Sequence, residues 1–367
     1  MTGTRAVPLA LRGLVERGEI GGRTVQLTDA GEVETVHYDP APLSDGHVRV
    51  RTVRSVISSG TEMTFYGRAA TNVYLHQHWN EELRIFEPGA ASMEYPLVIG
   101  YRAAGEVVES RSTDVAIGLR VYGSWRHTEL TSMPADVALA QALPDGLDWD
   151  DGVDLAQMGP ICVNAVTFGE LEQCGSAAVV FGAGVVGLLT AQIARASGAD
   201  PVYVVDRLGN RLEVAASLGL HPVDASRPEI DVAAKLKRAH GANGFPVAWE
   251  CTGSTRALHE AIRVVRRLGT VVAVGFYQGE GLGLMLGDEF HHNGVRIVCG
   301  QIGNVHPRQT WESLRAEAIR LALAGSLVLG GLPRLRLPVE QAAAGFAALQ
   351  RPDEALQVAL TYEAAAT

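Results

Sequence analysis

The chain has 367 residues, 47% hydrophobic and 20% charged, so it is long enough for two globular domains with large cores. Its formal net charge of −10 excludes a typical nucleic-acid partner, and no apolar run approaches the ~20 residues of a membrane span. Its four cysteines are far apart and include no CxxC pair, which favours a reducing cytoplasm over a disulfide framework.

Short period-two runs separated by turns predict a mostly antiparallel β domain in the first part of the chain. The candidate strands are Thr24–Leu27, Glu34–Tyr38, His47–Val56, Pro96–Ile99, Gly105–Glu109 and Gly118–Tyr122. Before them, Arg5–Ile20 is either a short amphipathic helix or a frayed extension. The stretch from Thr71 to Ser92 is irregular and aromatic, which is typical of a lid or a pocket wall.

From Leu155 the pattern changes to alternating helices and apolar strands, which predicts an α/β domain with a doubly wound parallel sheet. The candidate strands there are Ala177–Phe181, Val202–Asp206, Pro246–Glu250, Thr270–Val274 and Val295–Cys299. A last strand, Leu356–Tyr362, is expected to return to the first β domain. The predicted domains are 1–165 and 307–367 for the β domain and 166–306 for the nucleotide-binding domain.

The glycines Gly182, Gly184 and Gly187 form a GxGxxG turn between an apolar strand and an apolar helix. They allow a tight turn, close approach of a pyrophosphate and close helix–strand packing. The helix expected over Val186–Ala196 would direct free N–H groups at the phosphates, so Val185 and Val186 are predicted cofactor contacts. This context predicts a dinucleotide site.

Asp206 ends the second strand of this unit, nineteen residues beyond Gly187. A carboxylate there accepts hydrogen bonds from the ribose hydroxyls of NAD and repels the 2′-phosphate of NADP. The neighbouring Arg207 either stacks on adenine or pairs with that phosphate. We therefore expect NAD, with NADP as the alternative.

Further cofactor contacts are expected where later strands end, at the carboxyl edge of the sheet. Thr252 and Gly253 follow one strand, and Gly275 with Phe276 follow the next. Gln301 follows a third, and the pairs at 275–276 and 301–302 are expected to flank the nicotinamide. Plain core packing is the alternative for Phe276.

Several motifs together resemble the medium-chain dehydrogenase/reductase family, the family of zinc alcohol dehydrogenases and quinone reductases. They are Ser59-Gly-Thr-Glu62, Pro96–Gly100 with Ala104–Val107, Gly118–Val121, the turn at Gly182 and Glu250–Gly253. The resemblance covers Arg23 to Tyr362. It implies a GroES-like, partly open β-barrel catalytic domain with an inserted Rossmann domain.

The chain departs from this family at the metal positions. A catalytic zinc needs three protein ligands, usually thiolate, imidazole or carboxylate. By alignment the three positions hold Ser59, Tyr101 and Gly159, and the lobe for a structural zinc is missing after Val121. The sequence therefore predicts a zinc-independent member, similar to the bacteriochlorophyllide dehydrogenase-like group at Ser59–Gly67, Gly275–Gly279, Glu289–Asn293 and Gln301-Ile302.

Without zinc, side chains in the same cavity must polarise the reacting oxygen or move its proton. Tyr101 is the main candidate, and Arg102 is expected to lower its pKa. Glu62 is expected either to orient Arg102 or to cap the loop after Thr61. Ser59 and Thr61 could relay the proton, Thr61 because it matches the family's hydroxyl position. The alternative is that Ser59 and Tyr101 only fill the former metal cavity.

These residues predict an NAD(H)-dependent oxidoreductase that transfers hydride between nicotinamide and a secondary alcohol or ketone of a small metabolite. Reduction of conjugated C=C bonds is the second hypothesis, and a non-catalytic dinucleotide-binding relative is the third. The spacing of His76 and His78 is only a weak metal signal. Either Val295–Cys299 or Gly331–Leu337 is expected to form an apolar edge of the nucleotide-binding domain. A homodimer through that edge is expected, because an unpaired apolar edge invites pairing with a second copy.

Overall fold

The structure is a computed structural model that describes residues 7–67, 69–171 and 176–363. Met1–Gln157 and Pro333–Thr367 form one compact unit, here called the barrel unit, and Met158–Leu332 form the other, the nucleotide unit. These limits differ from the predicted boundaries at 165/166 and 306/307. Helices α5 (Met158–Phe168) and α11 (Trp311–Leu323) pack on each other, so both lie in the nucleotide unit.

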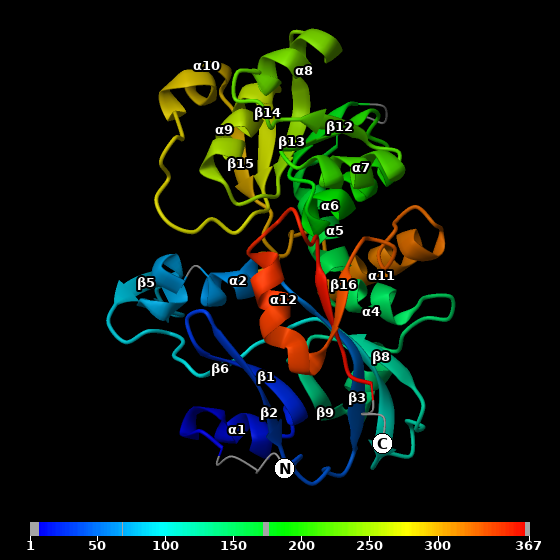
Figure 1. Cartoon of the computed structure of the whole chain (residues 1–367). Coiled ribbons are helices and arrows are strands. Elements are labelled where there is room, and N and C mark those ends of the chain that lie inside the picture. Colours follow the sequence, from blue (N-terminus) through cyan, green and yellow to red (C-terminus); the bar gives the residue numbers. More distant parts are fainter. Residues whose placement is uncertain (1–6, 68, 172–175, 364–367) are drawn as a thin grey trace. The chain divides into compact units, whose positions relative to one another are not determined.

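The described strands of the barrel unit form a nine-stranded, mostly antiparallel sheet (Figure 1). The long strand β3 is its centre, because it pairs with β7, β9 and β17 at different points of its length. The strands are β1 Gly21–Asp29, β2 Glu32–Tyr38, β3 His47–Ile57, β6 Leu97–Val98, β7 Ala103–Ser110, β8 Arg120–Gly123, β9 Thr128–Pro134, β16 Leu335–Pro338 and β17 Val358–Thr361. All six strands predicted for the first part of the chain are present within a few residues.

Alternating side chains of the barrel strands fill separate clusters of its core. Val48 and Val50 of β3 lie in one cluster with Trp125. Val25 lies in another, with Phe346 of α12. The short helices are η1 Leu9–Leu11, α1 Arg12–Glu16, α2 Thr61–Tyr66, η2 Ala69–Thr71, η3 Val73–Leu75, α3 Ala135–Ala140, α4 Trp149–Ala156, η5 Val339–Gln341 and α12 Ala342–Leu349. Of the helix considered for Arg5–Ile20, the structure has only η1 and α1 among the described residues.

The end of the chain returns to the barrel, as predicted, because β17 pairs antiparallel with β3. Strand β16 pairs with β17 in the same sheet. The expectation that Gly331–Leu337 forms an edge of the nucleotide unit is therefore wrong. A hairpin of β4 (Gln77–Asn80) and β5 (Ile85–Pro88) also replaces part of the stretch predicted to be irregular.

The nucleotide unit contains a six-stranded parallel sheet, in the order β12-β11-β10-β13-β14-β15 (Figure 1). This confirms the predicted doubly wound class. The strands are β10 Ala178–Phe181, β11 Val202–Asp206, β12 His221–Asp224, β13 Phe245–Glu250, β14 Val265–Ala273 and β15 Arg296–Cys299. The remaining helices are α6 Val185–Ala196, α7 Gly209–Ser217, α8 Val232–His240, α9 Thr255–Val264, η4 Leu286–Phe290 and α10 His291–Asn293.

Both faces of this sheet are buried, which explains why its central strands are continuously apolar. Val179 and Phe181 of β10 share a core cluster with residues of α8 and α9. Trp249 of β13 instead donates its indole N–H to the Ala165 carbonyl of α5 over 2.8 Å. No helix among the described residues is long and apolar enough to cross a membrane.

Candidate active site

The glycine turn lies between β10 and α6, as the GxGxxG spacing predicts. Gly182 has φ +101°, which favours glycine, and Gly184 is the N-cap of α6. A Cβ on Gly187 would overlap the carbonyl oxygen of Gly182, so only glycine allows this approach of helix and turn. Val185 and Val186 begin the helix, where backbone N–H groups have no partner within the helix. The turn has the geometry of an anion site at a helix N-terminus.

Asp206 ends β11 and is tied to the glycine turn. Its Oδ2 accepts from the Ala183 N–H over 2.6 Å, and its Oδ1 accepts from Arg207 N (2.7 Å) and Leu208 N (2.9 Å). The carboxylate is partly buried, whereas Arg207 is exposed. A further cation, Arg211, interacts with Asp206, although no sequence motif indicated it. Burial lowers the pKa of Arg211, and the negative charge of Asp206 opposes that shift. Asp206 therefore shapes the turn in addition to its predicted role toward ribose.

A buried carboxylate, Glu250, organises the neighbouring part of the carboxyl edge. It accepts from the N–H groups of Thr252 (2.7 Å) and Gly253 (3.1 Å), from the Thr252 hydroxyl and from the Tyr277 hydroxyl (2.5 Å). Burial raises the pKa of Glu250, and these hydrogen bonds oppose that shift. The motif Glu250–Gly253 identified the site, but the sequence analysis assigned no role to Glu250 or Tyr277.

The predicted residues of the cofactor edge lie together. A Cβ on Gly182 would press on the Thr252 side chain, and one on Gly275 would overlap the backbone of Gly253. Gln301 donates from Nε2 to the carbonyls of Val274 (2.6 Å) and Gly275 (2.9 Å). Its side-chain nitrogen is thus engaged in holding the loop after β14.

The loop that follows β14 continues with Phe276, which is partly buried. Its backbone lies close to Gly253, since a Cβ on that glycine would press on the Phe276 carbonyl. Gly253 has φ +73°, a backbone conformation that favours glycine. The structure thus brings the ends of β10, β13, β14 and β15 to one edge.

The hydroxyl cluster of the barrel unit is built on Ser58 rather than Ser59. The Tyr101 hydroxyl donates to Ser58 Oγ over 2.6 Å, and the Thr61 N–H donates to the same oxygen over 3.2 Å. Ser58 is buried, whereas Ser59 and Thr61 are exposed. Among the residues predicted for proton transfer, the structure therefore associates Thr61 with Tyr101 and leaves Ser59 outside the described hydrogen bonds.

The pKa of Tyr101 is raised, not lowered as expected. Burial is the main cause, and the charge of Glu62 adds to it, while Arg102, Ser58 and Thr61 oppose the shift. The charge of Arg102 does lower the pKa of Tyr101, but the loss of hydration of a buried phenolate raises it by more.

Arg102 is buried, and its hydrogen bonds go to partners other than Glu62. It donates to Asp154 Oδ1 over 2.9 Å and to the carbonyls of Val56 (3.2 Å) and Ile57 (3.4 Å). Asp154 of α4 also accepts from Arg334 over 3.0 Å. The expectation that Glu62 orients Arg102 is therefore wrong, because a buried aspartate that the sequence analysis missed is its partner.

Glu62 instead belongs to a buried hydrogen-bonded chain. Its Oε2 lies 2.8 Å from His127 Nε2, and His127 Nδ1 lies 2.8 Å from Ser55 Oγ. Ser55 Oγ lies 2.9 Å from the hydroxyl of Tyr362. The side chains are buried, His127 and Ser55 completely. His127 carried no sequence signal, since it stands alone just before β9, a strand that the sequence pattern did not indicate.

Side chains near the predicted site residues make structural contacts. Tyr66 packs on Phe346, with ring centroids 5.2 Å apart, and Arg68 lies outside the described residues. His76 and His78 are exposed and join no described group of three potential ligands. His292 Nδ1 is 2.9 Å from the carbonyl of Asp288, and its ring contacts that of its neighbour His291.

The side chains at the aligned metal positions do not fit a catalytic zinc ion. Ser59, Tyr101 and Gly159 provide no thiolate, imidazole or carboxylate. Among the described residues, one group of three potential ligands has its donor atoms within 4.8 Å of one another, namely His259, Asp288 and Glu289. It lies in the nucleotide unit, and Glu289 there already accepts from Arg263.

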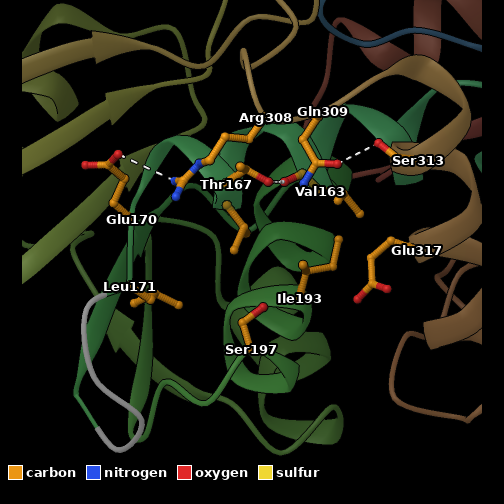
Figure 2. Close-up of a pocket in the computed structure, with 11 residues that line it drawn as sticks. Val163, Thr167, Glu170, Leu171, Ile193, Ser197, Arg308, Gln309, Ser313 and Glu317 are labelled. Atoms are coloured by element: carbon orange, nitrogen blue, oxygen red, sulfur yellow. Dashed lines mark hydrogen bonds and ion pairs between the residues drawn. The ribbon is translucent and has the colours of Figure 1, made fainter.

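A cavity of about 740 Å³ lies elsewhere in the nucleotide unit, between α5, α6 and the start of α11 (Figure 2). Ile193 and Ser197 line it at the C-terminal end of α6, whereas the glycine turn lies at the N-terminal end. Arg308 and Glu170 form an ion pair at its wall, and Gln309 accepts from Ser313 over 2.6 Å. This cavity is separate from the dinucleotide turn.

Comparison with known proteins relates this geometry to a family. Residues 185–319 match the family model described as zinc-binding dehydrogenase. D-guloside 3-dehydrogenase of Escherichia coli (strain K12) is 28% identical over 301 residues, covering 77% of this chain and 82% of the relative.

Two solved structures have the same fold. The crystal structure of 2R,3R-butanediol dehydrogenase from Bacillus subtilis has a TM-score of 0.74 at 19% identity. The match covers 93% of this chain and 99% of the chain in that crystal structure. The structure of a zinc-binding dehydrogenase from Sinorhizobium meliloti 1021, bound to NADP, has a TM-score of 0.70 at 20% identity. The match covers 93% of this chain and 99% of that one.

Residues 185–319 are therefore similar to zinc-binding dehydrogenases, and the chain has the fold of the medium-chain dehydrogenases and reductases, with a GroES-like unit and a Rossmann unit. The chain is an oxidoreductase related to alcohol and polyol dehydrogenases.

Proposed function

We propose that this protein is a cytoplasmic, zinc-independent, NAD(H)-dependent enzyme that interconverts a secondary alcohol and a ketone of a small polyhydroxylated metabolite. The proposal rests on one observation: the same chain has an intact dinucleotide turn and lacks zinc-binding side chains at the aligned metal positions. Gly182, Gly184 and Gly187 keep the turn, while Ser59 and Tyr101 replace metal ligands. Within the family, the bacteriochlorophyllide dehydrogenase-like group is the one we favour.

The cofactor would bind at the carboxyl edge of the parallel sheet. Its pyrophosphate would meet the N–H groups of Val185 and Val186, and Asp206 would accept from the ribose hydroxyls. Thr252, Gly253, Gly275, Phe276 and Gln301 surround the same edge and would flank the nicotinamide half. The Asp206 carboxylate would disfavour the 2′-phosphate of NADP, whereas the neighbouring cations Arg207 and Arg211 would attract it.

The proton would be handled by Tyr101. In ketone reduction, a bound nicotinamide would supply the hydride for the carbonyl carbon, and Tyr101 would give its phenolic proton to the substrate oxygen. In alcohol oxidation both transfers reverse. Ser58, bonded to Tyr101 and to the Thr61 backbone, holds the phenol in place, and the exposed Thr61 hydroxyl would connect it to solvent.

The substrate class follows from the relatives. D-guloside 3-dehydrogenase, by its name, oxidises a secondary hydroxyl of a sugar glycoside, and it is similar to this chain over 77% of its length. A polyhydroxylated ring or chain with a secondary alcohol is thus the first class to test.

Reduction of conjugated C=C bonds is a second candidate, favoured by one observation. The aligned metal positions Ser59, Tyr101 and Gly159 offer no Lewis acid, and an enone needs less polarisation of its oxygen than a ketone does. Tyr101 would then protonate the α-carbon or the enolate oxygen.

One screen distinguishes these functions. NADH consumption would be measured with sugar-derived ketones, simple ketones and enones, and NAD reduction with the matching alcohols. We expect turnover with a secondary alcohol and its ketone. Turnover with enones alone would select the second candidate, and tight NADH binding without turnover on any class would indicate a non-catalytic relative.

A further inference from the structure

A second cavity of the nucleotide unit, of about 550 Å³, lies at the amino edge of its parallel sheet. It is formed where β10, β13 and β14 begin and where α8 and α10 end. The glycine turn and Asp206 lie at the carboxyl edge of the same sheet, where open α/β sheets usually bind their ligands. This cavity, here called the amino-edge pocket, is therefore separate from the predicted dinucleotide site.

The charged side chains that line the amino-edge pocket are all basic. Its basic and amide side chains are Lys237, His240, Asn243, Arg266, Arg267 and Asn293. No described carboxylate lines it, although the chain has a formal net charge of −10. Such a local excess of positive charge in an acidic protein attracts anions.

A bulge in β14 supplies the two arginines. The pairing of β13 with β14 shifts its register here, so that Pro246 lies opposite the four residues 266–269. Leu268, in the bulge, has φ +59°, a left-handed conformation that is strained for leucine. Bulges change the direction of side chains, and strained backbone is concentrated at functional sites. This bulge places Arg266 and Arg267 on the wall of the pocket.

The last turn of α8 supplies Lys237 and His240. A Cβ on Gly244 would come within 2.6 Å of Lys237 Cε, so only glycine leaves room for the lysine stem there. Burial lowers the pKa of Lys237. The ring of His240 stacks on Phe245, with centroids 4.7 Å apart. Both cations are thus held at the pocket by packing, and a bound anion would offset the cost of burying the ammonium.

The carboxylate whose charge acts on Lys237 is bound by a different cation. It is Glu289, which accepts from Arg263 Nε over 3.2 Å, and Arg263 pairs with two further carboxylates. Neither Lys237 nor Arg267 has a hydrogen bond or an ion pair with a described residue. These two cations therefore keep their donors available for a ligand.

We propose that the amino-edge pocket is an anion site that binds the phosphate groups of a small phosphorylated molecule. Cations in the last turn of α8 alone would be explained by the helix dipole. The dipole does not explain the two arginines that the bulge of β14 adds at the same place. Two elements with different local reasons for their shape thus bring basic side chains into one cavity.

A phosphate fits this cluster better than a carboxylate does. A phosphoryl group carries about 1.5–2 negative charges and three acceptor oxygens on one centre. Arginine binds such a group through two parallel N–H···O bonds, and lysine binds it as a point charge. The volume of about 550 Å³ lies within the range of roughly 300–1,000 Å³ for small-molecule sites, which suits a phosphorylated metabolite.

Isothermal titration calorimetry of the full chain with pyrophosphate tests the proposal. We expect saturable binding by the wild type and binding that is about tenfold or more weaker in Arg267→Gln, because a charge-assisted hydrogen bond is lost. Lys237→Gln should have a similar effect. Arg267 is exposed, so its substitution should leave the fold intact, which circular dichroism would verify.

Two control variants separate the pocket from other sources of anion binding. Arg238→Gln removes the same charge from an exposed residue of α8 that does not line the pocket, so it should bind pyrophosphate as the wild type does. Gly184→Asp closes the glycine turn to phosphate by charge repulsion. A Cβ on Gly184 would meet only Arg211, 3.9 Å away, so the aspartate fits there. This variant should keep the binding that depends on Arg267.

Three results would overturn the proposal. They are no binding by the wild type, equal weakening by Arg238→Gln and Arg267→Gln, and loss of all binding in Gly184→Asp, which would assign the anion to the glycine turn. Citrate, a polyanion without phosphorus, should bind the wild type less tightly than pyrophosphate does, and equally tight binding would contradict the phosphate class. None of these measurements involves turnover, so failure of the proposed enzymatic function would leave them standing.

Discussion

Arg102 and Asp154 form a buried ion pair, with 2.9 Å between Nη1 and Oδ1, that joins the residue after Tyr101 to helix α4. Asp154 also accepts from Arg334, which pairs with Asp150 as well. The pair explains why Glu62 is free to bond His127 instead. Two charged residues that the sequence places near Tyr101 thus have separate partners, and only Glu62 retains an unsatisfied oxygen.

The carboxylate of Asp206 should decide the choice of dinucleotide. We expect the wild type to bind NAD more tightly than NADP, and Asp206→Ala to weaken NAD binding by roughly 1–3 kcal/mol, the cost of leaving buried hydrogen-bonding groups unpaired. Isothermal titration calorimetry measures both. Asp224→Ala is the matched control, since Asp224 lies beside Asp206 in the next strand. Tighter NADP binding by the wild type would contradict the prediction and assign the 2′-phosphate to Arg207.

Removal of the Tyr101 hydroxyl should slow the chemical step. Tyr101→Phe keeps the ring, so we expect kcat to fall by at least about 10²-fold, within the usual range of general acid–base catalysis, with little change in cofactor affinity. Thr61→Val should have a smaller effect of the same kind. Tyr66→Phe is the control, because Tyr66 packs on Phe346. Near-normal kcat in Tyr101→Phe would mean that Tyr101 only fills the former metal cavity.

The elements set by local spacing were predictable. The return of the last strand to the barrel was also predicted, but the side-chain contacts that depend on distant strand pairing were not. The turn from Gly182 to Gly187 and the acid Asp206 lie within one strand–helix–strand unit, so the sequence alone indicates them. Glu62 and His127 are 65 positions apart and meet only through the strand pairing of the barrel.

The sequence pattern did not place two short strands correctly, for a related reason. Strand β12 has one buried residue among four, so no periodic pattern marks it. Strand β16 has none, and it lies in the sheet only because β17 pairs with it. Their positions depend on the neighbours that they pair with, which a single sequence does not show.

The purified protein should contain no stoichiometric zinc. Ser59, Tyr101 and Gly159 lack the donor atoms that a catalytic zinc requires. Elemental analysis should therefore find well under one zinc per chain, and chelators should leave activity unchanged. About one zinc per chain, or loss of activity on chelation, would require ligands outside the aligned positions.

Strand β15 should pair with a second copy of the chain. It is an edge strand of the six-stranded sheet, and its residue Ile297 is 36% exposed. An unpaired edge with an exposed apolar side chain favours pairing with a second copy. We expect a homodimer in sedimentation experiments at micromolar concentration and a monomer for Ile297→Lys. His221→Lys, on the opposite edge strand β12, is the control that should stay dimeric. A monomeric wild type would exclude this assembly.

Leu268 should be a weak point of the nucleotide unit. It has φ +59° and is 61% exposed, so it combines a left-handed backbone with little burial of its side chain. Left-handed geometry costs an L-residue roughly 1–2 kcal/mol, and the greater freedom of glycine in the unfolded chain cancels part of the gain. We expect Leu268→Gly to raise the free energy of unfolding by up to about 1 kcal/mol in guanidinium denaturation. Leu323→Gly, at the end of α11 and 53% exposed, should instead lower it by up to about 1 kcal/mol, because its backbone is helical. Equal destabilisation by both substitutions would show that the contacts of the Leu268 side chain outweigh the strain of its backbone.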